Sequence, residues 1–331
     1  MRVGVLGVGR IGTFHAQTLA AHIGVERLML FDADGARARD LASSLAADVA
    51  ESPEELLGRV DAAVVAAPTA FNAELVHQCL SAGVPALCEK PVALDLADLN
   101  KVVEHSDEAG VPLQVGFQRR FDAGYREARR LCRNGDLGRI YTFRVAGHDP
   151  APPHADYIAT SGGIFRDLHI HDFDAIRFVL EQEVEEVVAY GGVLGFPEFA
   201  EADDYDSTVA SIRMADGTLG VLSGGRHDPL GYDIRMELFG SRDSISVGLD
   251  ERTPLRSVEP SMRPFEGPPY PDFQHRFEDA YRAEVATFLE VAAGREDNPC
   301  TAKDAYEALR IATACHVSAH ERRPVGLEEI A

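Results

Sequence analysis

Three ionisable side chains in this sequence have the types and positions that acid–base chemistry on a hydroxyl group requires: Lys90, Asp167 and His171. Asp167 and His171 are four residues apart, so on one helix they share a face. A carboxylate beside an imidazole fixes the orientation of the ring and raises its basicity. Such a pair suits a general base that removes a hydroxyl proton as hydride leaves. An isolated histidine is more often structural than catalytic, and the residues alone leave that alternative open.

Lys90 directly follows the apolar run Ala86–Cys88 and Glu89, where a predicted parallel strand ends. Ligands of open α/β sheets bind at the carboxyl ends of the strands. A lysine there can hydrogen-bond a substrate oxygen beside a nicotinamide; the alternative is an ordinary solvent-exposed lysine. A second polar turn follows the run Ala62–Ala66 in the same way. These two strand ends are therefore expected to contact a cofactor through Ala67, Pro68, Thr69, Glu89 and Lys90.

A glycine-rich turn near the N-terminus predicts what that cofactor is. An apolar run is followed by Gly7, Gly9 and Gly12, a helix-like stretch, a second apolar run and Asp32. The three glycines permit a tight turn, close approach to a pyrophosphate, and close packing of helix on strand. The helix start offers N–H groups to the phosphates. The alternative is a glycine turn in another kind of α/β protein. The predicted dinucleotide contacts are Gly7, Gly9, Arg10, Ile11, Gly12 and Asp32.

Asp32 also predicts which dinucleotide is bound. It lies 20 residues after Gly12, where an acid accepts the ribose hydroxyls. Its carboxylate would repel a 2′-phosphate, so the sequence favours NAD over NADP. Arg37 is the nearest base that could serve NADP, and we expect it to face solvent from the following helix.

Regular alternation of strands and helices over residues 1–120 predicts a Rossmann domain with a doubly wound parallel sheet. The expected strands are Arg2–Leu6, Arg27–Phe31, Ala62–Ala66, Ala86–Cys88 and Leu113–Gly116. The expected helices are Ile11–Ala21, Gly35–Leu45, Ala70–Ala82 and Leu96–Ala109.

Residues 121–331 change pattern and predict an α+β domain with a large open, mostly antiparallel sheet. The expected strands are Ile140–Val145, Val184–Tyr190, Ser207–Met214, Leu219–Ser223, Ile234–Gly240 and Ser244–Val247, with a turn at Asp216-Gly217. The expected helices are Ala123–Arg133, one continuous helix over Gly163–Leu180, Phe273–Ala293 and Ala302–His320.

The composition narrows the class of partner. The 331 residues carry 32 bases and 54 acids, a net charge of −22 that disfavours nucleic acid and anionic membranes. No apolar run approaches the roughly 18 residues of a membrane span. The five cysteines include no Cys-x-x-Cys pair, and the chain opens directly into a strand. We therefore expect free thiols in a cytoplasmic protein without a leader peptide or a metal site.

With these motifs together, the chain resembles the glucose-fructose oxidoreductase/inositol dehydrogenase (Gfo/Idh/MocA) family over nearly its whole length. The motifs are Gly7–Gly12, Ala67-Pro68-Thr69, Glu89-Lys90-Pro91, Gly116–Asp122, Gly162-Gly163 with Asp167 and His171, Tyr281-Arg282-x-Glu284 and Arg323-Pro324-Val325. The resemblance implies that His171 is the general acid/base, that Asp167 orients it, and that Lys90 holds the reacting oxygen. It also implies a homodimer or homotetramer joined through the open sheet.

Within the family, Asp149–Pro153, Tyr157-Ile158 and Gly231–Arg235 look most like inositol 2-dehydrogenases. The expected reaction is therefore NAD-dependent oxidation of a cyclic polyol, myo-inositol to 2-keto-myo-inositol. The alternatives are scyllo-inositol, another sugar or keto-sugar, and a non-catalytic NAD(P)-binding regulator. A polyol needs many hydrogen-bonding partners, and the candidates are Lys90, Asp149, His154, Tyr157, Asp167, His171 and Tyr232.

Three residues depart from the family pattern: Asn72, Gln118 and His169. Asn72 replaces a histidine, Gln118 an asparagine, and His169 a small hydroxyl residue between the two catalytic positions. On a continuous helix His169 would point about 200° away from His171, so the two histidines make a poor metal site. The departure at His169 leaves the identity of the sugar open.

Overall fold

The computed structural model describes residues 1–260 and 267–330. The chain forms two compact units, Met1–Gln118 with Asp279–Glu307, and Arg119–Glu278 with Ala308–Ala331. The first unit thus includes a segment from near the C-terminus. The division into domains 1–120 and 121–331 stays a prediction.

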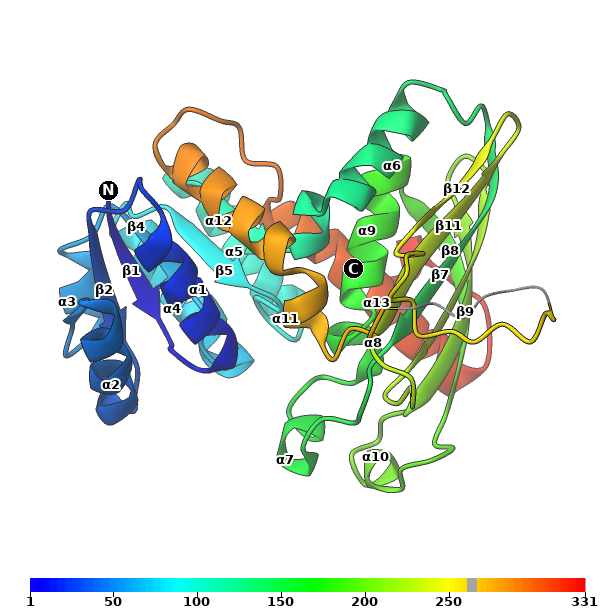
Figure 1. The fold of residues 1–331 in the computed structure, drawn as a ribbon, viewed down its shortest axis with the longest axis horizontal. Coiled ribbons are helices and arrows are strands. Elements are labelled where there is room, and N and C mark those ends of the chain that lie inside the picture. Colours follow the sequence, from blue (N-terminus) through cyan, green and yellow to red (C-terminus); the bar gives the residue numbers. More distant parts are fainter. Residues whose placement is uncertain (261–266, 331) are drawn as a thin grey trace. The chain divides into compact units, whose positions relative to one another are not determined.

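The first unit is built on a parallel sheet of six strands in the order β3-β2-β1-β4-β5-β6 (Figure 1). Its strands are β1 (Arg2–Leu6), β2 (Arg27–Phe31), β3 (Asp48–Val49), β4 (Ala62–Val65), β5 (Ala86–Glu89) and β6 (Leu113–Gly116). This arrangement confirms the predicted Rossmann sheet. The two-residue strand β3 was not predicted, since it is too short to produce an apolar pattern.

The helices of this unit follow the strands that the sequence predicts. They are α1 (Arg10–Ala21), α2 (Gly35–Leu45), α3 (Pro53–Leu57), α4 (Thr69–Ser81), α5 (Leu96–Ala109), α12 (Glu278–Ala292) and the start of α13 (Ala302–Glu321). Asp34, Ser52 and Asp95 begin α2, α3 and α5 by accepting backbone N–H bonds, as N-cap residues do. The α12 residues Val285 and Phe288 are buried in the same core as the strand residues, which explains why this late segment belongs to the first unit.

The second unit is built on a seven-stranded sheet in the order β12-β11-β7-β10-β9-β8-β13. Only the β7–β10 pair among the described strands of this sheet is parallel, which confirms the predicted, mostly antiparallel sheet. The strands are β7 (Ile140–His148), β8 (Val184–Gly192), β9 (Ser207–Met214), β10 (Leu219–Gly225), β11 (Asp233–Gly240), β12 (Ser244–Val247) and β13 (Val325–Gly326).

Helices cover one face of this sheet, where α6 and α9 lie beside the strands (Figure 1). The helices are η1 (Gln118–Phe121), α6 (Ala123–Arg133), α7 (Ala155–Ile158), α8 (Ile164–Asp167), α9 (Ile170–Leu180), α10 (Glu198–Glu201), α11 (Phe273–Arg276) and η2 (Leu327–Glu329). Along β9, side chains alternate between buried and exposed, because successive residues of a strand point to opposite faces. Among the described residues, the second face of the sheet is therefore open.

The continuous helix predicted over Gly163–Leu180 is wrong. The structure has two helices, α8 and α9, joined by Leu168 and His169. The backbone N–H groups of both joining residues bond to the carbonyl of Ile164, so the hydrogen-bond register slips by one residue. One extra residue turns the following side chains by about 100°. The helix predicted over Phe273–Ala293 is likewise divided, into α11 and α12.

Across the described residues, none of the helices combines the length and apolar character that crossing a membrane requires.

Candidate active site

The glycine turn after β1 has the geometry that the sequence predicts. Gly7 has φ +92°, and a Cβ on Gly12 would lie 2.0 Å from the carbonyl oxygen of Gly7, so neither position tolerates a side chain. A Cβ on Gly9 would meet nothing within 4 Å. Gly9 therefore leaves open space at the start of α1, where backbone N–H groups can approach a phosphate. This cradle fits a dinucleotide.

Asp32 is fixed by the same turn. Its carboxylate accepts hydrogen bonds from the backbone N–H of Val8 at 2.8 Å and of Asp34 at 2.9 Å. Arg37, expected to face solvent, has a side chain that is 54% exposed, and it also reaches the Asp32 carboxylate at 3.4 Å. Arg37 is thus exposed, as expected, and α2 begins close enough to Asp32 for an additional ion pair.

The turn that follows β5 is held by Asn72, one of the departures from the family pattern. Its buried amide donates to the carbonyl oxygens of Pro91 at 3.0 Å and Glu89 at 3.4 Å. These bonds fasten the turn that carries the half-buried Lys90. Ala67, Pro68 and Thr69 lead into α4, with Pro68 at the N-cap. Asn72 thus has a structural role here.

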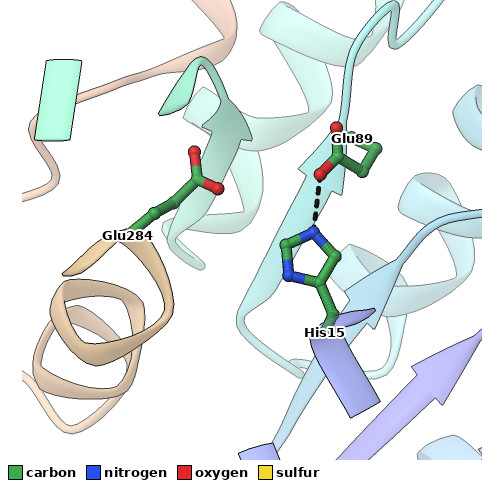
Figure 2. Close-up of side chains that lie close together, drawn as sticks. All are labelled: His15, Glu89 and Glu284. Carbon is green, nitrogen blue, oxygen red and sulfur yellow. Dashed lines mark hydrogen bonds and ion pairs between the residues drawn. The ribbon is translucent and has the colours of Figure 1, made fainter. Parts of the chain in front are cut away.

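A buried polar cluster lies behind Lys90, formed by His15 of α1, Glu89 of β5 and Glu284 of α12 (Figure 2). The Nε2 of His15 lies 2.6 Å from Oε1 of Glu89, the distance of a hydrogen bond. One polar atom from each residue lies within 4.8 Å of the others. Burial, with the charge of Glu89 adding to it, raises the pKa of Glu284 well above its usual value, which favours the uncharged form of this carboxyl group. The cluster fixes the strand end before Lys90. The sequence named Glu284 only as part of a family motif, and His15 was not predicted.

In the second unit, Asp167 is the centre of the polar contacts. The hydroxyl of Tyr157 donates to Oδ1 of Asp167 at 2.8 Å, and Nη2 of Arg226 lies 3.0 Å from Oδ2. Nη1 of Arg226 donates to Oδ2 of Asp149 at 3.1 Å. The structure therefore brings together three predicted substrate contacts, Asp149, Tyr157 and Asp167. The group that joins them, Arg226, was not predicted.

His171 and Asp167 do not share a helix face as predicted. Asp167 ends α8 and His171 lies in the first turn of α9, after the slip in hydrogen-bond register. His171 is half-buried. Regular helix spacing therefore does not describe how these two side chains are arranged, and the role of His171 stays a prediction.

The other two predicted substrate contacts lie in different surroundings. His154 caps α7, and its side chain is 81% exposed, with Nδ1 3.4 Å from Asp156. Tyr232 is buried, and its ring meets that of Phe277 edge-on. Burial raises the pKa of Tyr232, so the hydroxyl remains protonated. Substrate contact by these two residues stays a prediction.

His169 belongs to a buried hydrogen-bonded chain. Its Nδ1 lies 2.8 Å from Asp172 and its Nε2 2.8 Å from the hydroxyl of Thr208, while Arg119 pairs with Asp172. Burial opposes ionisation of Asp172, but Arg119 and His169 outweigh it and hold the pKa below its usual value. A Cβ on Gly224 would lie 2.0 Å from His169, so this strand position leaves room for the ring. His169 thus fastens the start of α9 to the sheet. Gln118, the remaining departure, is buried in η1.

Comparison with known proteins gives consistent matches along the chain. The family model described as "Oxidoreductase family, NAD-binding Rossmann fold" matches residues 1–117, and "GFO/IDH/MocA C-terminal domain" matches residues 125–246. A myo-inositol dehydrogenase of Streptomyces leeuwenhoekii is 43% identical, over 96% of this chain and 97% of the relative. A myo-inositol 2-dehydrogenase of Thermotoga maritima is 38% identical, over 100% and 99%.

A solved structure is similar over the whole fold. It is the scyllo-inositol dehydrogenase of Lactobacillus casei with bound NAD(H) and scyllo-inositol. It superposes with a TM-score of 0.89 at 27% identity, covering 99% of each chain.

Proposed function

Because the chain belongs to the Gfo/Idh/MocA oxidoreductase family, we propose that it oxidises myo-inositol to 2-keto-myo-inositol with NAD. The observation that carries the substrate class is the polar group of Asp149, Tyr157, Asp167 and Arg226. Hydroxyl-rich substrates need such acceptors and donors held in place, since a site built to pair hydroxyls rejects analogues that lack them. Two full-length relatives named as myo-inositol dehydrogenases support the choice of polyol.

The proposed cofactor is NAD rather than NADP. The open space at Gly9, the N-terminus of α1 and the fixed carboxylate of Asp32 would hold the dinucleotide. When bound, the nicotinamide accepts the hydride. The charge of Asp32 disfavours a 2′-phosphate. Its contact with Arg37 partly offsets that charge, so the preference for NAD has to be measured.

The proposed catalytic residues are Lys90, Asp167 and His171. His171 takes the proton of the reacting hydroxyl, Asp167 supplies the negative charge that favours the protonated imidazole, and Lys90 holds the reacting oxygen. The contacts of Asp167 with Tyr157 and Arg226 support its part, because they hold the carboxylate in one orientation. A non-catalytic regulator would not need all three residues.

The second candidate substrate is scyllo-inositol, favoured by the similarity to the Lactobacillus casei enzyme. The two inositols differ in the configuration of one hydroxyl group. The test is a panel of inositols, open-chain polyols, hexoses and sugar phosphates with NAD or NADP, followed by the absorbance of the reduced nicotinamide. Turnover of myo-inositol with NAD supports the proposal, and turnover only of a sugar phosphate or open-chain polyol overturns it.

We also propose a cytoplasmic homodimer or homotetramer joined through the open face of the second unit's sheet. That face exposes large apolar side chains, which usually mark an interface: Tyr141, Tyr190, Val209, Leu219 and Val221. The five free cysteines are consistent with a reducing compartment. Light scattering that gives the 35.9 kDa of one chain would refute the oligomer.

A further inference from the structure

Arg226 is a buried cation shared by two carboxylates that approach it from different elements. Its side chain is 3% exposed, and it lies 3.1 Å from Asp149 and 3.0 Å from Asp167. We infer that Arg226 is a positioning residue, which offsets the repulsion between the two carboxylates and holds both in place so that Asp167 can serve the proton transfer. This inference rests on the proposed function and adds to it a residue that touches no reacting atom.

The backbone fixes this arrangement. Strands β7 and β10 run parallel, with Gly225 paired to His148, so Asp149 and Arg226 leave the sheet at the same end. The N–H of Asp149 donates to the carbonyl of Gly225 at 2.9 Å, and that of Arg226 to the carbonyl of Asp206 at 2.8 Å. Arg226 is thus held at both its backbone and its guanidinium.

Electrostatics explains why a cation is needed there. The side chains of Asp149 and Asp167 are only 22% and 11% exposed, so water screens their mutual repulsion weakly. Asp204 is a third nearby carboxylate: burial raises its pKa, the charge of Asp167 adds to that rise, and Arg226 opposes it. Tyr157, on α7, donates a hydrogen bond to Asp167 but brings no charge. Without Arg226, the negative charges of these carboxylates would lose the cation that they share.

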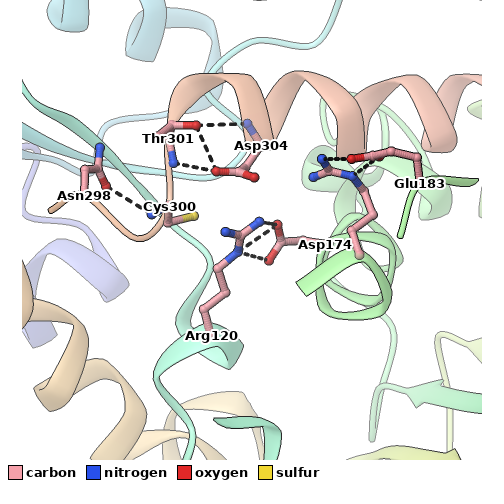
Figure 3. A network of polar contacts seen from close by, with 8 residues as sticks. Arg120, Asp174, Glu183, Asn298, Cys300, Thr301 and Asp304 are labelled. Carbon is pink, nitrogen blue, oxygen red and sulfur yellow. Dashed lines mark hydrogen bonds and ion pairs between the residues drawn. The ribbon is translucent and has the colours of Figure 1, made fainter. Parts of the chain in front are cut away.

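Comparison with another buried arginine of the same unit supports a distinct role for Arg226. Arg120 directs its guanidinium at the two oxygens of one partner, Asp174, at distances of 2.6–3.1 Å (Figure 3). Arg226 instead divides its contacts between two carboxylates, and its Nε makes no hydrogen bond to any described residue. The first geometry is that of a structural ion pair. Arg226 makes fewer hydrogen bonds to each carboxylate than Arg120 does, but it holds two carboxylates close together.

The experiment compares the pH dependence of kcat in three variants. Arg226→Gln removes the charge and retains most of the volume of the side chain. We expect kcat to fall about 10²-fold, the scale of lost acid–base catalysis. We also expect the acid limb, the part of the profile where kcat falls as the pH is lowered, to move to higher pH. Arg226→Lys keeps the charge and should keep the limb near its wild-type position. Adding Asp149→Asn to Arg226→Gln removes one of the repelling charges and should return the limb toward the wild-type position.

Arg120→Gln is the matched control, because it also removes a buried arginine from an ion pair. It should lower the unfolding midpoint without moving the acid limb. A folded Arg226→Gln protein with wild-type kcat and pH profile would overturn the inference and leave the proposed function intact. If Arg226→Gln does not fold, Asp149→Asn alone decides. Removing one of the two repelling charges while Arg226 stays should move the acid side of the kcat–pH profile to lower pH, and an unmoved profile in that variant overturns the inference. Wild-type inactivity toward every inositol would overturn the proposed function itself.

Discussion

Each unit buries carboxyl groups close together, and the two units resolve the resulting repulsion differently. In the first unit, burial and the charge of Glu89 raise the pKa of Glu284 and so favour its uncharged form. In the second unit, Asp149 and Asp167 share the guanidinium of Arg226. A protonated carboxyl group carries no charge and serves packing. Carboxylates paired with a cation remain charged acceptors, which proton transfer needs. We therefore expect stability to depend on the first cluster and turnover on the second.

The largest effect should come from the residue assigned to proton transfer. His171→Ala should lower kcat by about 10²–10⁴, the usual contribution of general acid–base catalysis. Affinity for NAD should be unchanged, because the predicted cofactor contacts lie in the first unit and His171 in the second. Steady-state kinetics with a separate NAD titration checks both statements. Near-normal turnover in this variant would show that the catalytic assignment is wrong.

A smaller effect should follow from the first unit's cofactor acid. Asp32→Ser should weaken NAD use roughly ten-fold or more, since a hydrogen bond to a charged group contributes about 1.5–3 kcal/mol. The preference for NAD over NADP should narrow in the same variant. Arg37→Gln is the control, because it removes the positive charge beside Asp32 and leaves the negative charge of Asp32 in place. This variant should prefer NAD over NADP more strongly than the wild type does. Equal wild-type turnover with both cofactors would contradict the role of Asp32.

Tyr157→Phe tests whether the hydrogen bond to Asp167 matters for turnover. Removing the hydroxyl should lower kcat/KM several-fold, less than the loss in His171→Ala, because the ring is 44% exposed and water can replace the donor. Tyr141→Phe, on the open sheet face, is the matched control. If both tyrosine variants behave as the wild type does, Tyr157 does not hold Asp167 for the reaction.

The smallest effect on turnover should come from the protonated carboxyl group of the first unit. Glu284→Gln should leave kcat near the wild-type value. In the wild type, the pKa of Glu284 is raised on folding, so above its unfolded value of 4.5 the unfolded chain loses a proton that the folded chain keeps. The free energy of unfolding therefore falls as pH rises toward the folded pKa.

Glutamine cannot titrate, so the Glu284→Gln variant should lose less stability than the wild type as the pH rises above 4.5, the unfolded value for glutamate. Urea unfolding at a series of pH values gives the two slopes. Identical slopes would mean that Glu284 is not protonated in the folded protein. If Glu284→Gln lowered kcat as much as His171→Ala does, the claim that the first cluster serves stability and the second serves turnover would be wrong.

The sequence predicts the first unit well because its signal is local. The turn at Gly7–Gly12 and the acid at Asp32 lie within one short stretch, and their spacing alone specifies strand, turn, helix and strand. The pairing of Arg226 with Asp149 joins residues 77 apart and depends on the parallel pairing of β7 with β10, which no local pattern indicates. Glu284 joins Glu89 from a helix near the other end of the chain for the same kind of reason.

The continuous helix through Asp167 and His171 was mispredicted for a different reason. Four-residue spacing implies a shared face only in an unbroken helix. The break lies where Leu168 and His169 both donate to the carbonyl of Ile164, and the His169 side chain there contacts Asp172 and Thr208. Those contacts form only when α9 lies on the sheet, so periodicity could not reveal them.

The most direct test is the reaction of the wild-type protein with myo-inositol and NAD, with the product identified by mass spectrometry. The account predicts reduced NAD in equal amount to a product lighter than myo-inositol by two hydrogen atoms. Deoxy-inositols that lack hydroxyls at the reacting face should be poor substrates. No activity on any inositol isomer, together with clear activity on an open-chain polyol or a sugar phosphate, would contradict it.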